Sequence, residues 1–404
     1  MSINNNTPSI RFSGFGGDWV EKKLGDIANF SKGSGYSKSD LRSSGHPIIL
    51  YGRLYTKYQT VISEVDTFVN ESKNSVKSQG NEVVVPASGE TAEDIARASA
   101  VKQKGIILGG DLNVVGLSDA YNSVFTALKI SNGQSKSALS KKAQGKSVVH
   151  IRNSDLQSLL LNFPNLEEQT TIGNFFQHID ETIALSRSKH KKTKTLKKSF
   201  LNKMFPQAGK SQPEIRLQGF SGDWVDKQLG DLSTVQMCKR IFKHETKENG
   251  QIPFYKIGTF GGVADAYIET ALYEDYKKKY PYPQASDILI SASGTIGRLI
   301  IYSGENAYYQ DSNIIWLNID KLQLVNSFLF CFYQTVKWNK IEGSTIKRLY
   351  NSDILSTSIK IPKIEEQAAI GQFFKQLDNT ITLQAKQLKA LENLKKALLA
   401  KMFV

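Results

Sequence analysis

The stretch PNLEEQTTIGNFFQHIDETIALSRSKHKKTKTLKKSFLNKMF, residues 164–205, occurs a second time as PKIEEQAAIGQFFKQLDNTITLQAKQLKALENLKKALLAKMF at residues 362–403. Both copies begin with Pro and Glu-Glu-Gln and end with Lys-Met-Phe. A proline followed by acidic residues is typical of a first helical turn, because carboxylates complement the helix dipole. Each copy is therefore predicted to form one long helix, over 167–205 and 365–403.

The second copy carries apolar residues at intervals of three and four positions, the spacing of a helix that packs against another helix. These residues are Ile370, Phe374, Leu377, Ile381, Leu388, Leu391, Leu398 and Met402, with Gln384 and Lys395 as interruptions. The first copy has apolar ends, but its centre holds Ser186, His190, Thr193 and Lys197. We expect the two copies to pair with each other along this seam.

The pairing is expected to be antiparallel. Each helix leads away from the domain that precedes it, so a pairing that returns the chain to its start must reverse direction. Val404 is then expected near the start of the first domain, so labels attached at Asn4 and Val404 should be separated by much less than the length of a helix. A helix over 167–205 is about 58 Å long at about 1.5 Å per residue, which suits a spacer.

A second repeat opens each half of the chain. Residues 8–27 (PSIRFSGFGGDWVEKKLGDI) match residues 213–232 (PEIRLQGFSGDWVDKQLGDL) with 13 identities in 20 positions. Phe15 and Trp19 are large apolar residues beside glycine turns, so they are expected to pack at the start of a domain. The chain thus consists of two similar units, joined by residues 206–213 (PQAGKSQP), that share a frame and differ in what lies inside it.

The residues inside each frame predict a mixed fold. Short runs of β-branched and aromatic residues between glycine turns predict strands at 47–50, 81–86, 101–108, 124–130, 252–257, 287–291, 298–302 and 313–317. Shorter helices are expected at 89–98 and 325–338. The predicted class is α+β, with mixed α/β domains at 1–162 and 206–360. Each is followed by a long helix, at 163–205 and 361–404, and the two helices form an antiparallel coiled coil.

Composition and charge narrow the function. Lys and Arg number 52 against 38 Asp and Glu, so the net charge of +14 favours a polyanionic partner, with nucleic acid first. The chain shows neither an apolar leader nor a run of about eighteen apolar residues, so we expect a cytoplasmic protein without a membrane partner. Its two cysteines, Cys238 and Cys331, are too few for a zinc cluster or a disulfide framework.

Motifs for catalysis and metal binding are missing from the sequence. The histidines are scattered, without cysteine or acidic residues at ligand spacing, at His46, His150, His178, His190 and His244. Gly145-Lys146-Ser147 is not a phosphate-binding loop, because position 140 is Ser where that motif requires Gly. We therefore predict a binding protein with no catalytic site, no metal and no cofactor of its own.

A few positions inside the two frames also repeat. By residue identity, Ser88-Gly89 aligns with Ser293-Gly294, Asp111 and Asn113 with Asp311 and Asn313, and residues 153–155 with 351–353. These positions either preserve turn geometry or contact a ligand, and the sequence leaves both readings open. The residues between them diverge, which indicates two different targets.

The order of a variable domain, a Leu-Glu-Glu-Gln helix, a second variable domain and an Ile-Glu-Glu-Gln helix resembles the specificity subunit of type I restriction–modification systems. The resemblance spans essentially the whole chain. It implies that each domain recognises one half of a split DNA sequence and that the antiparallel helices fix the gap. It also implies two methyltransferase subunits that bring S-adenosylmethionine and bind around the helices, with motor-nuclease restriction subunits as possible further partners. Helix residues expected at these contacts are Glu167, Glu168, Gln169, Phe175, Phe176, Glu365, Glu366, Gln367, Phe373 and Phe374.

Base-reading side chains are expected in loops of the two domains rather than on the long helices, because the helices repeat while the domains diverge. DNA bases are read by polar and basic side chains that reach their edges. The candidates are Lys32, Tyr36, Lys38, Tyr51, Arg53, Tyr55, Ser88 and Glu90 in the first domain, and Lys239, Arg240, Lys256, Ser293, Thr295, Arg298 and Arg348 in the second. Arg53→Ala and Arg298→Ala are each expected to relax one half-site.

Two other classes of function remain compatible with the sequence. A two-headed coiled-coil adaptor without specific DNA recognition would show the same repeats with an incidental charge. A stand-alone nuclease or methyltransferase is disfavoured by the missing cofactor motifs.

The helices are expected to act as a ruler. Two domains at opposite ends of a helix of about 58 Å can lie at most about 17 base pairs apart on straight DNA, at about 3.4 Å per base pair. Two domains that bind the same face of DNA prefer centres about 10 base pairs apart, which is one helical turn. Four residues inserted near Thr193 and near Leu391 are expected to widen the unread gap by about one or two base pairs.

Overall fold

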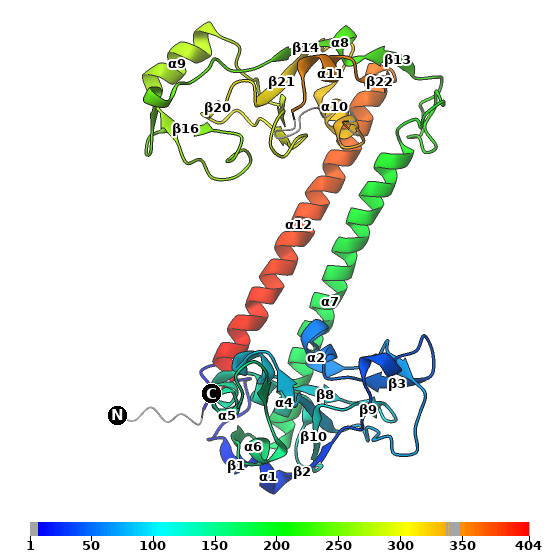
Figure 1. Cartoon of the computed structure of the whole chain (residues 1–404), viewed down its shortest axis with the longest axis vertical. Coiled ribbons are helices and arrows are strands. Elements are labelled where there is room, and N and C mark those ends of the chain that lie inside the picture. The colour runs from blue at the N-terminus through cyan, green and yellow to red at the C-terminus, as the bar shows by residue number, and fades with distance from the viewer. Residues whose placement is uncertain (1–6, 337, 339–347, 404) are drawn as a thin grey trace. The chain divides into compact units, whose positions relative to one another are not determined.

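The computed structural model describes residues 7–336, 338 and 348–403. The chain forms two compact units, one comprising Met1–Lys189 with Ala385–Val404 and the other comprising His190–Gln384. Each unit contains one mixed domain and a segment of both long helices (Figure 1). Among the described residues, no helix combines the length and the apolar character that crossing a membrane requires.

The domain of the first unit is built on a five-stranded sheet with the order β2-β10-β6-β8-β4. These strands are β2 (Ala28–Lys32), β10 (Leu112–Leu117), β6 (Glu82–Pro86), β8 (Ser99–Val101) and β4 (Val61–Ile62). Neighbouring strands are antiparallel except β4 and β8, which run parallel. The start and end of the domain are joined because β1 (Val20–Lys23) pairs with β12 (Leu160–Phe163).

Smaller elements complete this domain. A three-stranded sheet holds β5 (Phe68–Val69), β3 (His46–Ile49) and β9 (Ile107–Leu108), and β7 (Ser88–Gly89) pairs with β11 (Val149–His150). The helices are α1 (Leu24–Ile27), α2 (Arg53–Thr56), α3 (Ala92–Ile95), α4 (Ser123–Ser131), α5 (Gly133–Lys142) and α6 (Asn153–Gln157), with a 3-10 turn η1 (Lys38–Asp40).

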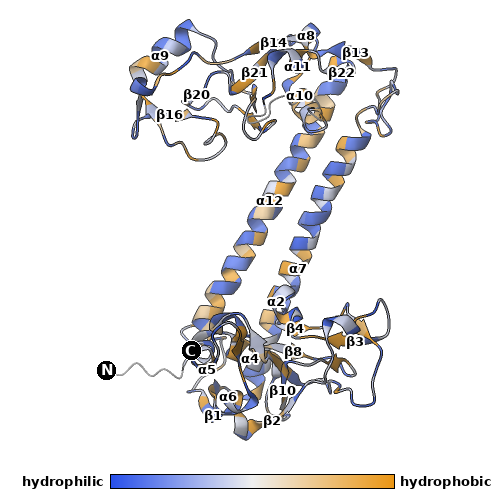
Figure 2. Ribbon diagram, in the orientation of Figure 1, coloured by the Kyte–Doolittle hydropathy of each residue, from blue (hydrophilic) through white to orange (hydrophobic). Residues whose placement is uncertain are grey.

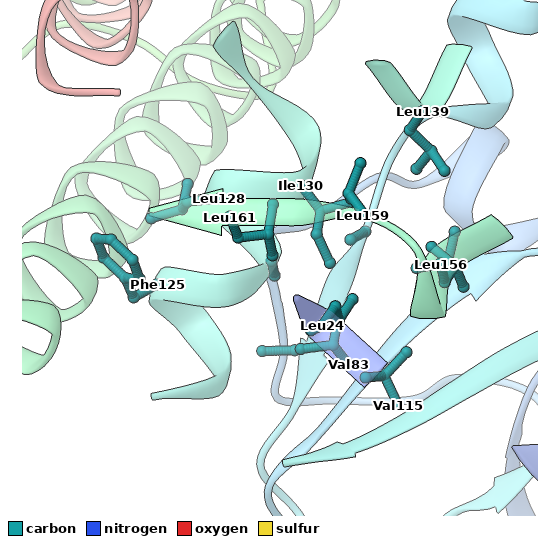
Figure 3. Packing of buried hydrophobic residues seen from close by; sticks show 14 of the residues in the cluster. Leu24, Val83, Val115, Phe125, Leu128, Ile130, Leu139, Leu156, Leu159 and Leu161 are labelled. Carbon is teal, nitrogen blue, oxygen red and sulfur yellow. The ribbon is translucent and has the colours of Figure 1, made fainter. Parts of the chain in front are cut away.

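The core of the first unit lies between the sheet and α4. Figure 3 shows side chains from α1, β6, β10, α4 and β12 meeting in this core, among them Leu24, Val83, Val115, Phe125 and Leu161. All five are fully buried. Burying a large apolar side chain contributes about 1.5–3 kcal/mol, so this cluster is the main stabilising feature of the domain.

Lys129 is a charged residue inside that core. It lies on α4 with 1% of its surface exposed, and its Nζ is 5.6 Å from the centre of the Trp19 ring. Burial lowers the pKa of this lysine to about 8. An unfolded lysine titrates near about 10.4, so between about pH 8 and about pH 10.4 the unfolded state binds more protons and stability rises with pH.

We therefore expect Lys129→Met to raise the free energy of unfolding by about 2 kcal/mol at pH 7, where the buried ammonium is charged. The difference from the natural protein should shrink by about pH 10. Denaturant unfolding at both values measures it, with Lys141→Met on the exposed face of α5 as the control. A Lys129→Met protein less stable than the natural one at pH 7 would contradict the expectation.

The domain of the second unit repeats the plan with a four-stranded sheet of order β14-β21-β18-β19. These strands are β14 (Ser233–Gln236), β21 (Ile314–Ile319), β18 (Ile288–Ser291) and β19 (Leu299–Ile301). A second sheet has the order β15 (Thr246–Lys247), β17 (Tyr267–Ile268), β16 (Ile252–Tyr255) and β20 (Tyr308–Tyr309), and β13 (Val225–Gln228) pairs with β22 (Ser358–Ile361). The helices are α8 (Leu229–Leu232), α9 (Thr270–Lys279), α10 (Asn326–Tyr333) and α11 (Asn351–Leu355), with a 3-10 turn η2 (Lys243–Glu245).

The strand registers define which residues of the two domains are equivalent. Pro86 of β6 faces Leu112, and Ser291 of β18 faces Ile314. The amide of Ala87 donates to the carbonyl of Asp111 at 2.7 Å, and the amide of Ala292 donates to the carbonyl of Asn313 at 2.8 Å. Asp111 is therefore the counterpart of Asn313, and the expected match of Asp111 with Asp311 is wrong. Matching by identity failed because hydrogen-bond register, rather than residue type, fixes the position.

The strand predicted at 124–130 is also wrong, because these residues form α4. The side chain of Asn122 caps this helix, with Oδ1 accepting from the amides of Val124 and Phe125 at 3.0 Å each. Residues 123–130 are all buried, so the helix has no amphipathic period to distinguish it from a strand. The strand expected at 101–108 is divided between β8 and β9, and α5 and α9 were not predicted.

The two long helices are α7 (Leu166–Lys203) and α12 (Ile364–Met402), which confirms the predicted helices to within two residues. Hydrophobic and hydrophilic residues alternate along both (Figure 2). In the first unit Asp180 pairs with Lys395, and Arg187 pairs with Glu392 at 2.6 Å. Residue numbers rise along α7 as they fall along α12, so the predicted antiparallel pairing is confirmed. The Lys395 interruption of the apolar seam is explained by its bond to Asp180.

The second unit contains the matching part of the pair. Lys197 of α7 lies 2.6 Å from Asp378 of α12, and Phe200 packs edge-on against Phe373 with ring centres 5.3 Å apart. The order is again antiparallel. Lys197, one of the polar residues in the centre of the first copy, is therefore also held by a specific ion pair.

The Lys-Met-Phe ends of the helices enter the domain cores. Met402 and Phe403 belong to the core of the first unit, and Met204 and Phe205 belong to the core of the second. The amide of Ile10 donates to the carbonyl of Lys401 at 3.2 Å. The end of α12 thus lies against the start of the first domain, as predicted. Val404 and Asn4 themselves fall outside the described residues.

Candidate nucleic-acid interface

Each domain has a polar hollow beside the end of its central sheet. The hollow of the first domain, about 300 Å³, is lined by Lys32, Ala87, Asp111, Gln144, His150, Ile151, Arg152 and Asp155. The hollow of the second domain, about 530 Å³, is lined by Arg240, Ile241, Phe242, Lys243, Thr246, Phe254, Lys256, Ala266, Gln310, Asp311, Ser312, Asn313 and Arg348.

The two hollows share equivalent positions with different side chains. His150 faces Ser88 across β11 and β7, and Arg348 faces Ser293 in the same way. His150 and Arg348 are therefore counterparts, as are Asp111 and Asn313. The frame holds each pair in place and the chemistry differs between the domains, which is the pattern expected of surfaces that read different sequences.

A capped turn follows the first strand of each central sheet. In η1 the amide of Ser37 donates to Oδ2 of Asp40 at 2.7 Å, and in η2 the amide of Phe242 donates to Oε2 of Glu245 at 2.7 Å. The bond from Ser37 lowers the pKa of Asp40. Each cap fixes its turn, which presents an exposed lysine, Lys38 or Lys243. An ammonium on a fixed turn is suited to a phosphate contact.

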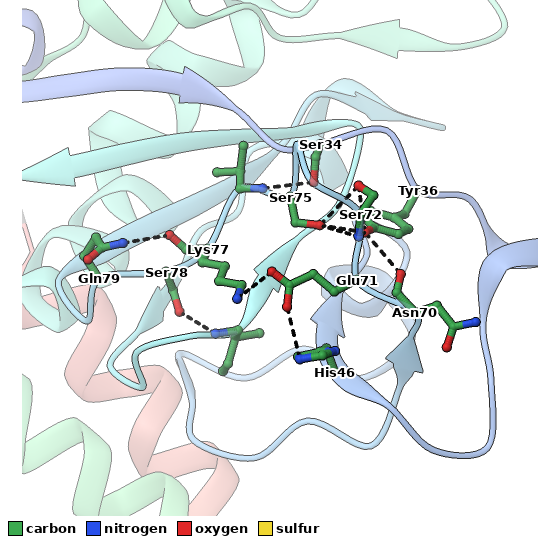
Figure 4. Close-up of polar contacts among 12 residues, drawn as sticks. Ser34, Tyr36, His46, Asn70, Glu71, Ser72, Ser75, Lys77, Ser78 and Gln79 are labelled. Carbon is green, nitrogen blue, oxygen red and sulfur yellow. Dashed lines mark hydrogen bonds and ion pairs between the residues drawn. The ribbon is translucent and has the colours of Figure 1, made fainter.

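The aromatic candidates of the first domain are partly engaged inside it. Figure 4 shows Tyr36 among polar residues that include Ser72 and Ser75. Its Oη lies 2.6 Å from Oγ of Ser75 and accepts from the amide of Ser72 at 2.8 Å, and hydrogen bonding with Ser72 lowers its pKa. Tyr55 donates to the carbonyl of Ser88 at 2.8 Å, and burial raises its pKa to about 12. Tyr51 is exposed and packs edge-on against Tyr55.

The remaining first-domain candidates are spread over different parts of the surface. Lys32 lines the hollow, whereas Lys38 lies on η1 and Glu90 is exposed beyond β7. The side chain of Ser88 is buried and donates to Oδ2 of Asp111 at 3.3 Å. The structure therefore does not bring these residues together into one cluster.

Both terminal nitrogens of Arg53 are engaged within the first domain, whereas its buried Nε makes no hydrogen bond to the described residues. Its Nη1 bonds Asp66 at 2.6 Å, its Nη2 bonds Gln59 at 2.9 Å and the carbonyl of Glu64 at 2.8 Å, and its side chain is 8% exposed. Bonds from Lys57 and Arg53 hold the pKa of Asp66 at about 2. These contacts indicate that Arg53 holds residues 59–66 in place rather than presenting its guanidinium to a ligand.

We expect Arg53→Ala to lower the free energy of unfolding by about 2 kcal/mol, because it removes a side chain that is only 8% exposed together with its three hydrogen bonds. Denaturant unfolding measures the loss, and Lys57→Ala, which removes only the exposed partner of Asp66, is the control. Equal stability of the two variants would contradict this. The same Arg53→Ala variant also tests the prediction that Arg53 reads a base, because the loss of a base reader would relax one half-site.

The candidate residues of the second domain lie closer together than those of the first domain. Arg240, Lys256 and Arg348 line one hollow, whereas Thr295 and Arg298 line a neighbouring one of about 190 Å³. Lys256 pairs with Asp265 at 2.9 Å, and Arg298 donates to the carbonyl of Phe260. The Nζ atom of Lys239 lies 5.1 Å from the centre of the Tyr280 ring. Ser293 Oγ donates to Asn313 Oδ1 at 2.6 Å, and Arg348 Nη2 donates to the carbonyl of Ser312 at 2.8 Å.

Several residues of these surfaces escaped the sequence prediction: Phe242, Lys243, Gln310, His150 and Arg152. Lys243 had a signal, because it occupies the frame position of Lys38. Phe242 is 52% exposed and stacks on His244 with ring centres 5.9 Å apart. The others lie on chain segments that meet only after folding, so sequence spacing could not connect them.

The Glu-Glu-Gln motif has an internal structural use. The Oε atoms of Glu168 accept from Nε and Nη2 of Arg11 at 2.6 Å each, and the Glu168 side chain is 0% exposed. In the second unit Glu366 accepts from Nε and Nη2 of Arg216 at 2.8 Å each. These bonds raise the pKa of both arginines. Arg11 and Arg216 were missed, although both stand in the repeated opening segment.

The glutamine of the motif is likewise internal. Gln169 accepts from the amide of Asn122 at 3.0 Å and donates to the carbonyl of Pro164 at 2.9 Å. Gln367 accepts from the amide of Val325 at 3.1 Å. Phe176 and Phe374 are buried, Phe175 and Phe373 are partly exposed, and Glu167 and Glu365 are exposed. Partner contacts at these ten helix residues stay a prediction, and the exposed carboxylates are the members open to a partner.

The described residues contain no group of three or more His, Cys, Asp or Glu placed to hold a metal ion. Cys238 and Cys331 are buried free cysteines, and burial raises the pKa of each thiol to about 12. Such thiols are protonated at neutral pH, which makes them poor nucleophiles.

Comparison with known proteins agrees with this architecture. The family model of the type I restriction modification DNA specificity domain matches residues 16–195 and 221–393. A protein of Haemophilus influenzae named "Putative type I restriction enzyme specificity subunit S.HindORF215P" is 52% identical over 158 residues. That match covers 38% of this chain and 41% of the relative, so the chain spans about two fifths of its length.

Longer matches extend over nearly the whole chain. The type I restriction enzyme MjaVIII specificity subunit of Methanocaldococcus jannaschii is 22% identical over 406 residues, covering 95% of this chain and 91% of that protein. The crystal structure of the type I restriction-modification S subunit from M. genitalium has a TM-score of 0.63 at 17% identity and covers 98% of this chain and 99% of its own. Because its specificity domain is matched twice in tandem, the chain belongs to the type I restriction modification DNA specificity family.

Proposed function

We propose that this protein is the DNA-recognition subunit of a type I restriction–modification complex, with each domain reading one half of a bipartite site. The observation that carries this is a repeated frame holding different side chains: His150 and Asp111 in one hollow, Arg348 and Asn313 in the other. A net charge of +14 supplies the sequence-independent attraction to phosphates.

The methylation chemistry is assigned to partners. We propose two methyltransferase subunits that carry S-adenosylmethionine and dock around α7 and α12, with motor-nuclease restriction subunits joining in cleavage-competent complexes. This chain then contributes no catalytic residue, metal or cofactor, and works in the cytoplasm where the DNA is. The antiparallel helices set the gap between the half-sites.

Methylation mapping of DNA modified by the reconstituted complex tests the proposal. The expected result is one bipartite motif with two specified halves and an unread gap. A complex assembled without this chain is the control and should not modify that motif. Modification of the same motif without this chain would overturn the proposal.

A gel shift addresses the adaptor alternative. The complex is titrated with duplexes that carry or lack the mapped motif, at low and at moderate salt. Sequence-specific binding that persists at moderate salt supports recognition, because contacts to base edges add to the salt-sensitive phosphate term. Equal binding to both duplexes at every salt concentration would favour the adaptor.

A further inference from the structure

Arg240 differs from the other candidate arginines in how its guanidinium is held. It lies between β14 and η2, and its Nε donates to Oδ2 of Asp311 at 2.9 Å. The Arg240 side chain is 60% exposed, whereas the Asp311 side chain is 15% exposed. Within the described part of the chain, this guanidinium makes its hydrogen bond through Nε. Both terminal nitrogens can therefore donate to a ligand in the hollow of the second domain.

Each of the other three candidate arginines, Arg53, Arg298 and Arg348, has at least one terminal nitrogen engaged within the protein. Arg53 uses both for three acceptors in a buried setting. Arg298 donates through Nη1 to the carbonyl of Phe260, and Arg348 donates through Nη2 to the carbonyl of Ser312. Among the four candidate arginines, and within the part of the chain that the structure describes, Arg240 is therefore the one with both terminal nitrogens open to a ligand.

Asp311 is itself fixed by the backbone around it. Its carbonyl accepts from the amide of Asn313 at 2.7 Å, and the next residue, Ser312, has a φ of 62°. The carbonyl of Ser312 accepts from Arg348 at 2.8 Å. This bend at the start of β21 places the Asp311 carboxylate beside Arg240. An arginine held in this way loses less side-chain entropy on binding.

The geometry selects a chemical class of ligand. The two terminal N–H groups of a planar guanidinium match two adjacent acceptors, and in the major groove guanine presents that pair at O6 and N7. Adenine offers N7 beside an amino donor, which opposes a second N–H. A carboxylate at Nε keeps the plane of the fork oriented, so Asp311 is a positioning residue.

We infer that Arg240, oriented by Asp311, reads a guanine in the half-site of the second domain. The inference rests on the proposed function. The frame position of Arg240 is occupied by Gly35 in the first domain, so this contact belongs to one half-site alone. Phe242 and Lys243 flank the fork on the same turn, where Lys243 is suited to the adjoining phosphate.

The test uses the reconstituted complex and methylation mapping on a library of sites randomised at each position. Arg240→Lys keeps the charge and removes the fork. We expect it to lose discrimination at one G·C pair in one half-site, with binding to the original site weaker by about 10- to 100-fold and an unchanged salt dependence. The other half-site should stay as it was.

Asp311→Asn is the second variant, and it should relax the same base pair to a smaller degree because Arg240 remains. Asp226→Asn is the matched control, since it also removes the carboxylate of an ion pair in this unit, the one with Lys360 at 2.6 Å. The control should leave the motif unchanged. Asp311→Asn also decides the question if Arg240→Lys fails to assemble.

Two outcomes would overturn the assignment while leaving the proposed function in place. One is an Arg240→Lys or Asp311→Asn complex with the same preference at every position, and the other is a loss that is equal for all sequences, which indicates a phosphate contact. A natural complex that modifies no bipartite site would instead overturn the proposed function, and this inference with it.

Discussion

Replacing Glu168 by Ala is expected to lower the free energy of unfolding of the first unit by about 3 kcal/mol. The carboxylate is completely buried and bonds two nitrogens of Arg11, so its removal leaves a largely buried guanidinium without its counter-charge. Breaking a buried ion pair costs about 3–5 kcal/mol. The lower end of this range applies here, because the Arg11 side chain is 14% exposed and water can reach it. Denaturant unfolding followed by near-ultraviolet circular dichroism measures the loss.

The neighbouring residue provides the control for this prediction. Glu167 is exposed on the same helical turn, so Glu167→Ala should change stability by less than about 0.5 kcal/mol. The double variant Arg11→Ala with Glu168→Ala should lose less than the two single losses added together, because neither charge is then left unpaired. Similar losses for Glu167→Ala and Glu168→Ala would show that the ion pair does not anchor the helix.

The repeated frame could be predicted from the sequence because its signals are local. Glu-Glu-Gln after a proline, apolar residues at helical spacing and the recurring Lys-Met-Phe led to α7, α12 and their antiparallel pairing. What the motif is for was less accessible. Glu168 bonds an arginine 157 positions earlier in the chain, and no pattern of spacing predicts a contact of that range.

The domains between the helices were predicted less well for a related reason. α4 lacks an exposed face, so its sequence resembles that of a buried strand. The equivalence of Asp111 with Asn313 depends on hydrogen-bond register, which residue identity does not report. Candidate readers such as Arg53 were chosen by residue type, and type does not distinguish a guanidinium with three internal acceptors from one that is exposed.

The second large effect is expected from lengthening the two helices together. The units meet along the sequence between Lys189 and His190 in α7 and between Gln384 and Ala385 in α12. Four residues of high helix propensity inserted at both places add about 6 Å to each helix without entering either unit. Methylation mapping should then show the same two half-sites separated by about one or two additional base pairs, and the original site should no longer be modified.

Inserting the four residues into α7 alone is the control for this last prediction. It displaces one side of the antiparallel seam by about 6 Å, so pairs such as Lys395 with Asp180 and Lys197 with Asp378 cannot form together with an unshifted register. We expect that variant to lose stability and recognition, whereas the double insertion keeps both pairs because both helices grow equally. An unchanged gap in a stable double-insertion complex would contradict a ruler and leave α7 and α12 as a docking surface for the partner subunits.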